Sequence, residues 1–490
     1  RSMPRENAVS SKRLVTNGYV VTMDDSLPEV PRGAVLVEDG KIAAVGPADQ
    51  FDGVDADVID ARGGLIMPGM IDTHRHTGAS LNRGFGADKS LLEYLSDVFT
   101  RFVPALTVDD LHLSSVIGGL EALDAGVTTV LDCGDVTTTR GHAEANIQGL
   151  VDSGIRAVYA YGLSDEDYPG VGSGAVAARA RLTDVAELKD AGGDLVRVGM
   201  SLAHLGTVPF EQTEASIHLA DELGMLCCSH TAGLKNSNYI NGVRERAHRG
   251  LMLPGHVYIH VTNLNDQEWQ LIADTGGKAS IAPETEMQMG MGMPPFRACM
   301  DHGVPVSLST DTIGSGSADL LSQMRLGLQL QRALDNEESH GRGAIPFRIE
   351  LTTRDALAWG TRNGADALGL DRTVGTLTIG KAADLVVVSD RRALSPTNDP
   401  VGGAVLQSTA ADVDLVLVNG EVRKRDGKLV GHDLAGIRAR ATETLGRITE
   451  HVAQTAALTG PQLRAFLADS ERQATVHFAE AYTAPERAAD

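Results

Sequence analysis

Short segments in which apolar and polar residues alternate lie near both ends of the chain. Such alternation, interrupted by glycine and aspartate, is typical of β-strands that bury one face. We therefore expect residues 1–66 and 366–430 to form one small β-sandwich domain, with the middle of the chain inserted between its two halves. The segments are 18–23 (GYVVTM), 34–40 (AVLVEDG), 41–46 (KIAAVG), 384–390 (DLVVVSD) and 414–420 (DLVLVNG).

The middle of the chain, residues 67–365, alternates apolar runs with amphipathic stretches. Runs such as 128–134 (TTVLDCG) and 304–311 (VPVSLSTD) are apolar along most of their length, as expected for parallel strands covered on both faces. Stretches such as 210–224 have helical spacing. We count eight such runs from residues 64–74 onward, which predicts an α/β fold of the (β/α)₈ TIM-barrel type. An open, doubly wound sheet is the alternative, but no glycine-rich phosphate loop follows the first run.

The last part of the chain, residues 431–490, is rich in alanine, arginine and glutamate. This composition predicts a C-terminal helical extension, and Pro461 stands where proline is favoured, in the first turn of a helix. We expect the extension to pack on the barrel or on a second subunit. A homodimer or homotetramer is the corresponding prediction for the assembly.

Composition and charge narrow the class of protein. The chain has 490 residues, of which 42% are hydrophobic and 22% charged, as in a globular protein with an ample core. A net charge of -22 argues against a nucleic-acid partner. No apolar run reaches the roughly 18 residues of a membrane span, and the first 15 residues lack the apolar core of a signal peptide. The four cysteines form no CxxC pair, which favours reduced thiols in the cytoplasm.

The stretch MPGMIDTHRHTGAS (67–80) places His74 and His76 at the end of the first predicted strand. Active sites of TIM barrels lie at the C-terminal ends of the strands, and residues two apart in a strand point to the same side. His230, His260 and Asp311 end the fifth, sixth and eighth predicted strands. Imidazole and carboxylate groups that converge there predict one divalent metal per chain, zinc or alternatively iron(II), with an open position for water.

Several other side chains near the strand ends are candidates for contact with a small-molecule substrate. His142 follows the second predicted strand, His204 ends the fourth, and Arg83 follows the first and would suit an anionic group. The run EMQMGMGMPP (286–295) includes Met289, and thioethers adapt to flat or irregular ligands. Packing, or anchoring of the residue's own loop, is the alternative for each.

The segment PGMIDTHRH (68–76) resembles the signature of the amidohydrolase superfamily, in which PG is followed by two hydrophobic residues and D-x-H-x-H. Residues 380–390 and 415–430 are similar to the second half of its β-sandwich, so the resemblance spans about residues 11–430. LEALDAGVTTVLD (120–132) and HGVPVSLSTD (302–311) resemble the branch of cytosine, guanine and S-adenosylhomocysteine deaminases, melamine deaminase and triazine chlorohydrolases. No lysine ends the fourth run, where two-metal members carry a bridging lysine, which implies one metal.

The resemblance also implies a role for each matching residue. His74, His76 and His230 match metal ligands, and Asp311 matches the residue that touches the metal and accepts a proton from water. His260 matches a histidine that assists the attacking water. The implied reaction is metal-assisted hydrolysis, in which hydroxide attacks an sp² carbon and an amine or another group leaves.

One departure from the family pattern bears on the substrate. Deaminases of this branch carry HxxE on the fifth strand, and the glutamate shuttles protons to a ring nitrogen. Here His230 is followed by Thr-Ala-Gly, so that Gly233 replaces the glutamate, and the seventh-strand SHxP of relatives is SIAP. Glu284 and Glu286, just past the seventh strand, are candidates to protonate the leaving nitrogen, and a solvated pair in a loop is the alternative.

These observations leave three functions in view. The first is a metal-dependent aminohydrolase that deaminates a small nitrogen heterocycle or amidine-like carbon. The second uses the same site to open a cyclic amide, lactam or imide, or to remove chloride. The third is a metal-free scaffold relative, which the complete set of histidines and Asp311 disfavours.

Overall fold

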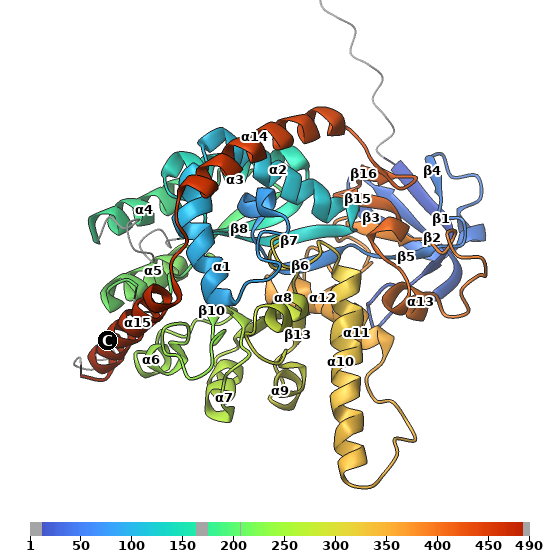
Figure 1. The fold of residues 1–490 in the computed structure, drawn as a ribbon. Coiled ribbons are helices and arrows are strands. Elements are labelled where there is room, and N and C mark those ends of the chain that lie inside the picture. The colour runs from blue at the N-terminus through green and yellow to red at the C-terminus, as the bar shows by residue number, and fades with distance from the viewer. Residues whose placement is uncertain (1–11, 163–174, 206, 484–490) are drawn as a thin grey trace, which may run out of the picture. The chain divides into compact units, whose positions relative to one another are not determined.

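The computed structural model describes residues 12–162, 175–205 and 207–483 (Figure 1). The expectation that no signal peptide is present falls largely on residues 1–11, outside the described residues. The chain forms two compact units. The sheet unit comprises residues 1–71, 122–129 and 319–432, and the barrel unit comprises residues 72–121, 130–318 and 433–490.

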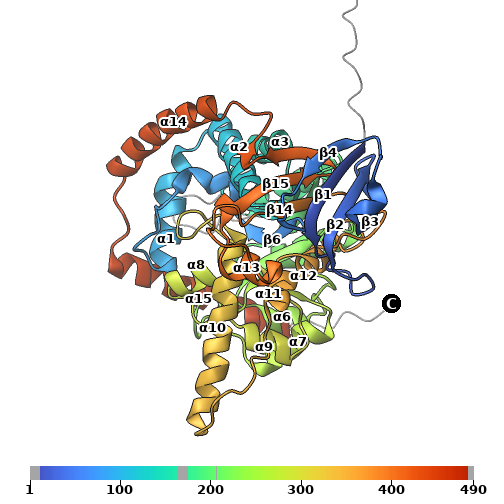
Figure 2. The same ribbon diagram turned by 90° about the vertical axis from the view of Figure 1, so that its right-hand side faces the viewer.

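The sheet unit contains a mixed sheet of nine strands, in which strands from both ends of the chain are neighbours (Figure 2). The order is β17-β16-β15-β14-β5-β1-β2-β3, with β4 beside β1. Strand β5 joins the two halves, because it pairs in parallel with β1 and antiparallel with β14. The strands are β1 Lys12–Val20, β2 Val30–Glu38, β3 Lys41–Pro47, β4 Asp57–Asp60, β5 Leu65–Pro68, β14 Leu385–Val388, β15 Val413–Val418, β16 Glu421–Arg425 and β17 Lys428–Leu429.

The alternating pattern of the sequence explains how this sheet buries its core. Val15 and Val35 from the N-terminal strands, Ile66 from β5, and Leu385 and Leu417 from the C-terminal strands all lie in one buried cluster. Side chains two apart share a face of a strand, and three strands accordingly contribute such pairs to the cluster: Val35 and Val37 from β2, Leu385 and Val387 from β14, and Leu415 and Leu417 from β15. Burial of this shared apolar surface holds the two ends of the chain together.

The second sheet has eight parallel strands in the order β13-β12-β11-β10-β9-β8-β7-β6. Its edges meet where the backbone N–H of Asp311 donates to the carbonyl of His74 at 3.0 Å, and that of His76 donates to the carbonyl of Asp311 at 3.1 Å. The predicted TIM-barrel fold is therefore confirmed, and the open-sheet alternative is wrong. The strands are β6 Met70–Arg75, β7 Val127–Gly134, β8 Arg156–Gly162, β9 Val196–Ser201, β10 Cys227–Thr231, β11 Val257–His260, β12 Lys278–Ile281 and β13 Val306–Leu308.

Helices follow the strands in both units, and several begin with strong capping signals. Ser90 and Glu93 form a capping box at the start of α1, as do Asn265 and Glu268 at the start of α7. The described helices before the C-terminal extension are α1 Leu91–Asp97, α2 Val108–Asp124, α3 Arg140–Ser153, α4 Ala175–Leu188, α5 Phe210–Glu222, α6 Val243–His248, α7 Asp266–Asp274, α8 Pro283–Gln288, α9 Phe296–Asp301, α10 Leu320–Gly341, α11 Thr353–Trp359, α12 Arg362–Ala367 and α13 Pro400–Leu406.

The C-terminal extension forms the predicted helices, α14 (Leu434–Gln454) and α15 (Gly460–Thr483). Both pack within the barrel unit. Ile448 of α14 joins the buried cluster that contains Phe102, and Phe466 of α15 lies 5.9 Å from Tyr239, measured between ring centroids. Glu471 of α15 accepts a hydrogen bond from the backbone N–H of Asn238 at 2.9 Å.

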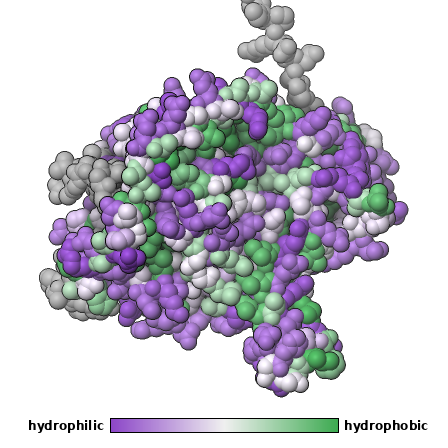
Figure 3. Space-filling model, viewed as in Figure 1, coloured by the Kyte–Doolittle hydropathy of each residue, from purple (hydrophilic) through white to green (hydrophobic). Residues whose placement is uncertain are grey.

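The surface is largely polar in the view of Figure 3. The segment that follows α10 is an exception, because Ile345 and Phe347 are exposed there. None of the described helices combines the length and the apolar character that a membrane crossing requires.

We predict that Glu471→Ala weakens the attachment of α15. The Glu471 carboxylate also contacts the Ser237 hydroxyl, so the variant loses charge-assisted hydrogen bonds to one loop. Unfolding in urea should show a loss of about 1–2 kcal/mol in the free energy of unfolding. Arg472→Ala is the matched control, because Arg472 pairs only with Asp469 on the surface among the interactions of the described residues. Equal stability of the two variants would contradict this account of α15.

Candidate metal centre

Two histidines from the first barrel strand face the same carboxylate. Nε2 of His74 lies 3.0 Å from Oδ1 of Asp311, and Nε2 of His76 lies 3.3 Å from the same oxygen. His74 belongs to β6, whereas His76 follows the last residue of that strand and begins the short helix η2 (Thr77–Asn82). The period of two along an extended backbone therefore brings both imidazoles to one point, as the sequence predicts.

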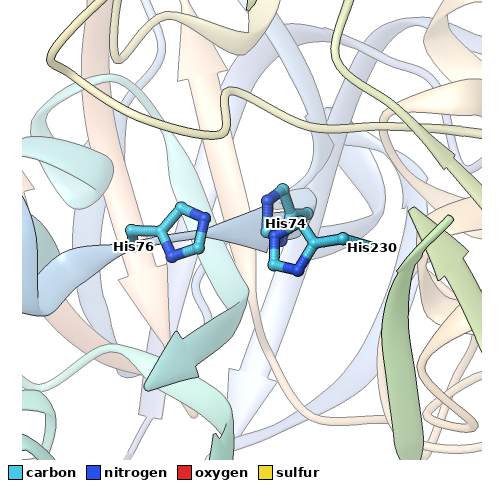
Figure 4. A group of neighbouring side chains, drawn as sticks. All are labelled: His74, His76 and His230. Atoms are coloured by element: carbon cyan, nitrogen blue, oxygen red, sulfur yellow. The ribbon is translucent and has the colours of Figure 1, made fainter. Parts of the chain in front are cut away.

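Two further histidines, from the ends of β10 and β11, complete the cluster. The ring centroids of His230 and His260 lie 4.9 and 5.5 Å from that of His74. The side-chain donor atoms form two overlapping groups, His74 with His76 and His230, and His74 with His260 and Asp311. Within each group the atoms lie within 4.8 Å of one another. Figure 4 shows the three rings of the first group close together.

The Nδ1 atoms of His74 and His76 face away from this cluster, and each has a partner within the protein. Nδ1 of His74 lies 3.2 Å from Sγ of Cys133, and Nδ1 of His76 lies 3.2 Å from the carbonyl of Cys133. Nε2 of His74 is buried and faces Oδ1 of Asp311 at 3.0 Å, but without the alignment of a regular hydrogen bond. An unsatisfied buried nitrogen is costly, whereas a metal ion would satisfy it. The donor set of imidazoles and one carboxylate fits a divalent metal.

Protonation favours the same interpretation. Burial lowers the pKa of His74 to about 4 and that of His230 well below its usual value, so both rings are neutral at neutral pH. Burial alone would raise the pKa of Asp311, but the facing imidazoles of His74, His76 and His260 hold it well below the usual value. Neutral imidazoles and an ionised carboxylate are the forms that bind metal. Burial opposes the charge of His76, but the carboxylates of Asp311 and Asp135 outweigh it and raise the pKa of His76 to about 9, so this ring has to lose a proton when a metal binds.

Two of these residues occupy an unusual backbone region. His260 has φ 74° and Asp311 has φ 57°, and the neighbouring residues Ala232 and Val261 also have positive φ. The left-handed region costs a non-glycine residue of order 1–3 kcal/mol, and such strain concentrates at functional sites. The rest of the barrel therefore has to stabilise these conformations.

Asp72, the aspartate of the PGMIDTHRH segment, holds two parts of the site in register. Its Oδ1 accepts hydrogen bonds from the backbone N–H of His74 at 3.3 Å and of Thr310 at 3.1 Å. Asp72 is fully buried, and these bonds tie β6 to the residue before Asp311. It thus fixes the positions of His74 and Asp311 without facing the cluster itself.

The two glutamates predicted beside the site differ in their surroundings. Both lie in helix α8, not in a loop, because Pro283 suits the first turn of a helix. Glu286 is fully buried, its Oε1 lies 3.3 Å from Nδ1 of His260, and burial raises the pKa of its carboxyl. Glu284 instead accepts a hydrogen bond from the backbone N–H of Ser317 at 2.7 Å.

The four residues predicted to contact substrate do not gather in one place. His204 lines the cavity above the cluster, and its ring centroid lies 5.5 Å from that of His230. Arg83 is 61% exposed in its side chain and pairs with Glu121. Among the described residues, neither Arg83 nor the remaining two, His142 and Met289, line the cavity.

His142 and Met289 are both buried. Nδ1 of His142 lies 2.7 Å from the Thr139 hydroxyl in the first turn of α3, and the backbone of Met289 bonds to Thr285 in α8. These contacts favour packing roles. Met291, two residues further on, lines the cavity instead.

One acidic residue of the cavity was not among the candidates predicted from the sequence. Asp135 lines the cavity, and its Oδ2 lies 3.7 Å from Nδ1 of His76 and 3.8 Å from Nε2 of His230. It follows Gly134, the last residue of β7, so it occupies a strand end like the histidines. The rule that active-site residues follow barrel strands would have identified it.

Comparison with known protein families agrees with this geometry. Residues 65–423 match the model of the amidohydrolase family, which covers most of the chain. The chain belongs to the amidohydrolase family. A short segment, residues 33–50, also matches an imidazolonepropionase-like composite domain of bacteria. The predicted family is thus confirmed.

Curated relatives of this amidohydrolase include deaminases. A 5-methylthioadenosine/S-adenosylhomocysteine deaminase from Symbiobacterium thermophilum is 30% identical, over 89% of this chain and 98% of that protein. A 5'-deoxyadenosine deaminase from Methanothermobacter thermautotrophicus is 28% identical, over 82% of this chain and 91% of that protein.

Solved structures share the fold of this amidohydrolase. An adenosine deaminase from Xanthomonas campestris with bound zinc has a TM-score of 0.77 at 22% identity, covering 91% of this chain and all (100%) of that one. A mutant atrazine chlorohydrolase from Arthrobacter aurescens, complexed with zinc and atraton, has a TM-score of 0.78 at 23% identity, covering 88% of this chain and 100% of that one. At these identities the likeness concerns the fold.

We predict that His74→Ala lowers metal binding strongly. The substitution removes the nitrogen shared by both groups of donor atoms, so the bound metal should fall from about one per chain to a small fraction of that, at least 10-fold in affinity. Metal analysis after extensive dialysis measures the ratio. His112→Ala is the control, since Nε2 of His112 contacts Asp152 on the surface. Unchanged metal content in His74→Ala would show that the ion binds elsewhere.

Proposed function

We propose that this amidohydrolase deaminates a small, amino-substituted nitrogen heterocycle or amidine-like carbon in a metal-dependent reaction. The observation that carries the proposal is the convergence of His74, His76 and His230 with Asp311 beneath a cavity at the barrel mouth. His74, His76, His230 and Asp311 hold the metal, and His260 stands beside them. The names of the curated relatives support deamination as the reaction.

Zinc is the proposed metal, with iron(II) as the alternative. Imidazole nitrogen and carboxylate oxygen suit both ions, and the two solved neighbours described above contain zinc. One metal per chain is proposed because the end of the fourth barrel strand, Met200-Ser201, carries no lysine. Metal analysis of the purified protein distinguishes zinc from iron.

Asp311 is proposed as the group that moves protons. When bound, a divalent metal lowers the pKa of a water molecule toward neutrality. The Asp311 carboxylate, ionised for the reasons given above, would accept a proton from the attacking water. After water has added to the amino-bearing carbon, Asp311 returns the proton to the departing nitrogen, and ammonia leaves.

His260 is proposed to hold the water and the new oxygen in place. Its Nε2 lies 3.9 Å from Oδ2 of Asp311, and its Nδ1 faces the buried Glu286. Glu286 is not among the cavity-lining residues of the described chain, so its proposed role is to position His260. Glu284, which binds Ser317, has no proposed role in the chemistry.

A second proton transfer, to a ring nitrogen of the heterocycle, needs another group. Gly233 lines the cavity, and a Cβ at this position would lie 3.0 Å from Cε of Met291 and 4.0 Å from Cδ2 of His260. A glutamate side chain there would thus stand over His260, but this chain has none. We assign the transfer to Asp135, whose carboxylate faces His76 and His230 across the cavity floor.

The second candidate function keeps the site and changes the bond. In the opening of a cyclic amide, lactam or imide the ring nitrogen is itself the leaving group, so the proton that Asp311 takes from water can go to it and no second acid is needed. In the removal of chloride the leaving group needs no proton. Gly233 is the observation that favours it. A metal-free scaffold role is disfavoured by the two overlapping groups of donor atoms, which both include His74. Assembly as a homodimer or homotetramer stays a prediction.

Ammonia release tests the proposed function directly. We expect the metal-replete protein to release ammonia from at least one member of a panel of cytosines, guanines, adenosine derivatives, aminotriazines and cyclic guanidines. The His74→Ala variant is the blank, and its signal should fall at least about 1,000-fold. Silence across the panel, with one metal bound per chain, would contradict deamination and favour the second candidate.

We predict that Glu286→Leu lowers kcat more than it raises KM. The variant leaves Nδ1 of His260 without its carboxylate partner, and a misplaced assisting group costs about 10- to 100-fold in kcat. Glu286→Gln keeps a hydrogen-bond acceptor beside His260 and should restore most of the loss. Steady-state kinetics on any substrate from the panel gives both constants. Equal kcat in the wild type and Glu286→Leu would contradict the positioning role.

A further inference from the structure

The cavity above the candidate metal centre has a polar floor and apolar walls. It holds about 610 Å³ of space that no atom fills, part of it open to solvent. The polar groups that line it are the histidines 76, 204, 230 and 260, Asp135 and the Tyr94 ring with its hydroxyl. The other lining residues of the described chain are Ala79, Leu91, Leu95, Val98, Phe99, Val136, Gly233, Ile240 and Met291.

The one hydroxyl among the wall residues is already engaged. The Tyr94 oxygen lies 2.8 Å from both Nδ2 of Asn82 and the hydroxyl of Thr312. His204 stands nearer the floor, where its Nδ1 lies 3.2 Å from the Tyr239 hydroxyl. In the described part of the chain, therefore, the one polar group among the wall side chains is already bonded within the protein.

The wall residues pack against a buried cluster on their far side, so the cavity exists before a ligand binds. Leu91 and Leu95 lie on α1, and Val98 and Phe99 lie on the π-helical turn that follows it, η3 (Val98–Phe102). Most of these residues belong to the buried cluster that also includes Ile448 of α14. Helical turns of this rare kind are frequent at functional sites.

We propose that the substrate carries an uncharged, apolar body, an alkyl or aryl group, on its nitrogen-containing head. The inference rests on the proposed function in one respect: it takes the reacting carbon to lie at the polar floor beside His76 and His230. The body then lies among α1, η3, Ile240 and Met291. An apolar group gains from contact with these walls, whereas a hydroxyl group placed there loses its bonds to water without replacement.

This assignment predicts a substrate that differs from those in the names of the curated relatives. A nucleoside bears hydroxyl groups on its ribose, and a site for it needs buried polar partners for them. The described walls of this cavity supply none. We therefore expect selection against hydroxyl groups on the body of the substrate, at about 10- to 100-fold in affinity for a matched pair.

Two pairs of compounds test the inference with the full-length, metal-replete protein. 9-Propyladenine is compared with 9-(2,3-dihydroxypropyl)adenine, and N-propylmelamine with N-(2,3-dihydroxypropyl)melamine. Binding is measured by titration calorimetry and ammonia release in parallel. The members of a pair share a head and a carbon chain and differ only in two hydroxyl groups. We expect tighter binding of the propyl member in at least one pair, by about 10-fold or more.

The outcomes separate the inference from the proposed function. Equal or reversed preference in both pairs, or no binding of any of the four compounds, would overturn the apolar assignment. If the propyl members bind more tightly but none of the four compounds releases ammonia, the apolar assignment of the cavity stands. The ammonia-release panel described above then decides whether the protein is a deaminase. If the diol members are preferred and release ammonia, deamination stands and the apolar assignment falls.

Variants locate the preference in the wall. Val98→Thr is close to isosteric and adds one hydroxyl to the cavity surface. It should reduce the preference for the propyl member by roughly 2- to 10-fold, because the diol gains a partner. Val103→Thr is the matched control, since Val103 belongs to the same buried cluster but is not among the cavity-lining residues of the described chain. A preference changed by Val103→Thr and not by Val98→Thr would overturn the placement of the body along η3.

Discussion

The closure of the barrel between His74 and Asp311 is the interaction on which the site depends. The backbone N–H of Asp311 donates to the carbonyl of His74, and the side chains of the same two residues face each other at 3.0 Å. Parallel strands end at one edge of a barrel, so groups that follow different strands meet there. The contacts that close the barrel therefore also bring the metal-binding side chains together. Asp72 reinforces it from inside the protein by bonding to the backbone on both sides of the junction.

Strain and burial at this junction have a common physical origin. His260 and Asp311 adopt left-handed backbone conformations that a non-glycine residue avoids, and the imidazoles of His74 and His230 are held neutral by burial. Neither condition is favourable for the isolated chain. Both are imposed by the packed barrel around them, and both prepare the donor atoms for a divalent ion. Part of the free energy of folding therefore stabilises an arrangement of ligand side chains that exists before a metal binds.

The cavity above the metal centre shows how a shared fold acquires its own specificity. The floor follows the family pattern, whereas the walls derive from α1, η3 and the segments that carry Ile240 and Met291. These segments rest on the C-terminal helices, since Ile448 of α14 packs with η3 and Glu471 of α15 bonds to the loop that leads into Ile240. Gly233 also lines the cavity and places no side chain in it. The C-terminal extension, remote in sequence, therefore contributes to the shape of the site.

The sequence by itself determined the barrel, the β domain formed from both chain ends, and the strand-end histidines. It could do so because periodicity in apolar residues and the i, i+2 spacing of His74 and His76 are local properties of an extended backbone. Only the tertiary structure decided that Glu286 lies behind His260, that Asp135 reaches the floor, and that Arg83 and His142 lie away from the cavity. Those facts depend on which side chains from distant segments share a space, and no local pattern encodes that arrangement. The apolar character of the cavity walls is a property of the folded chain for the same reason, because α1, η3 and the segments that carry Ile240 and Met291 supply it together.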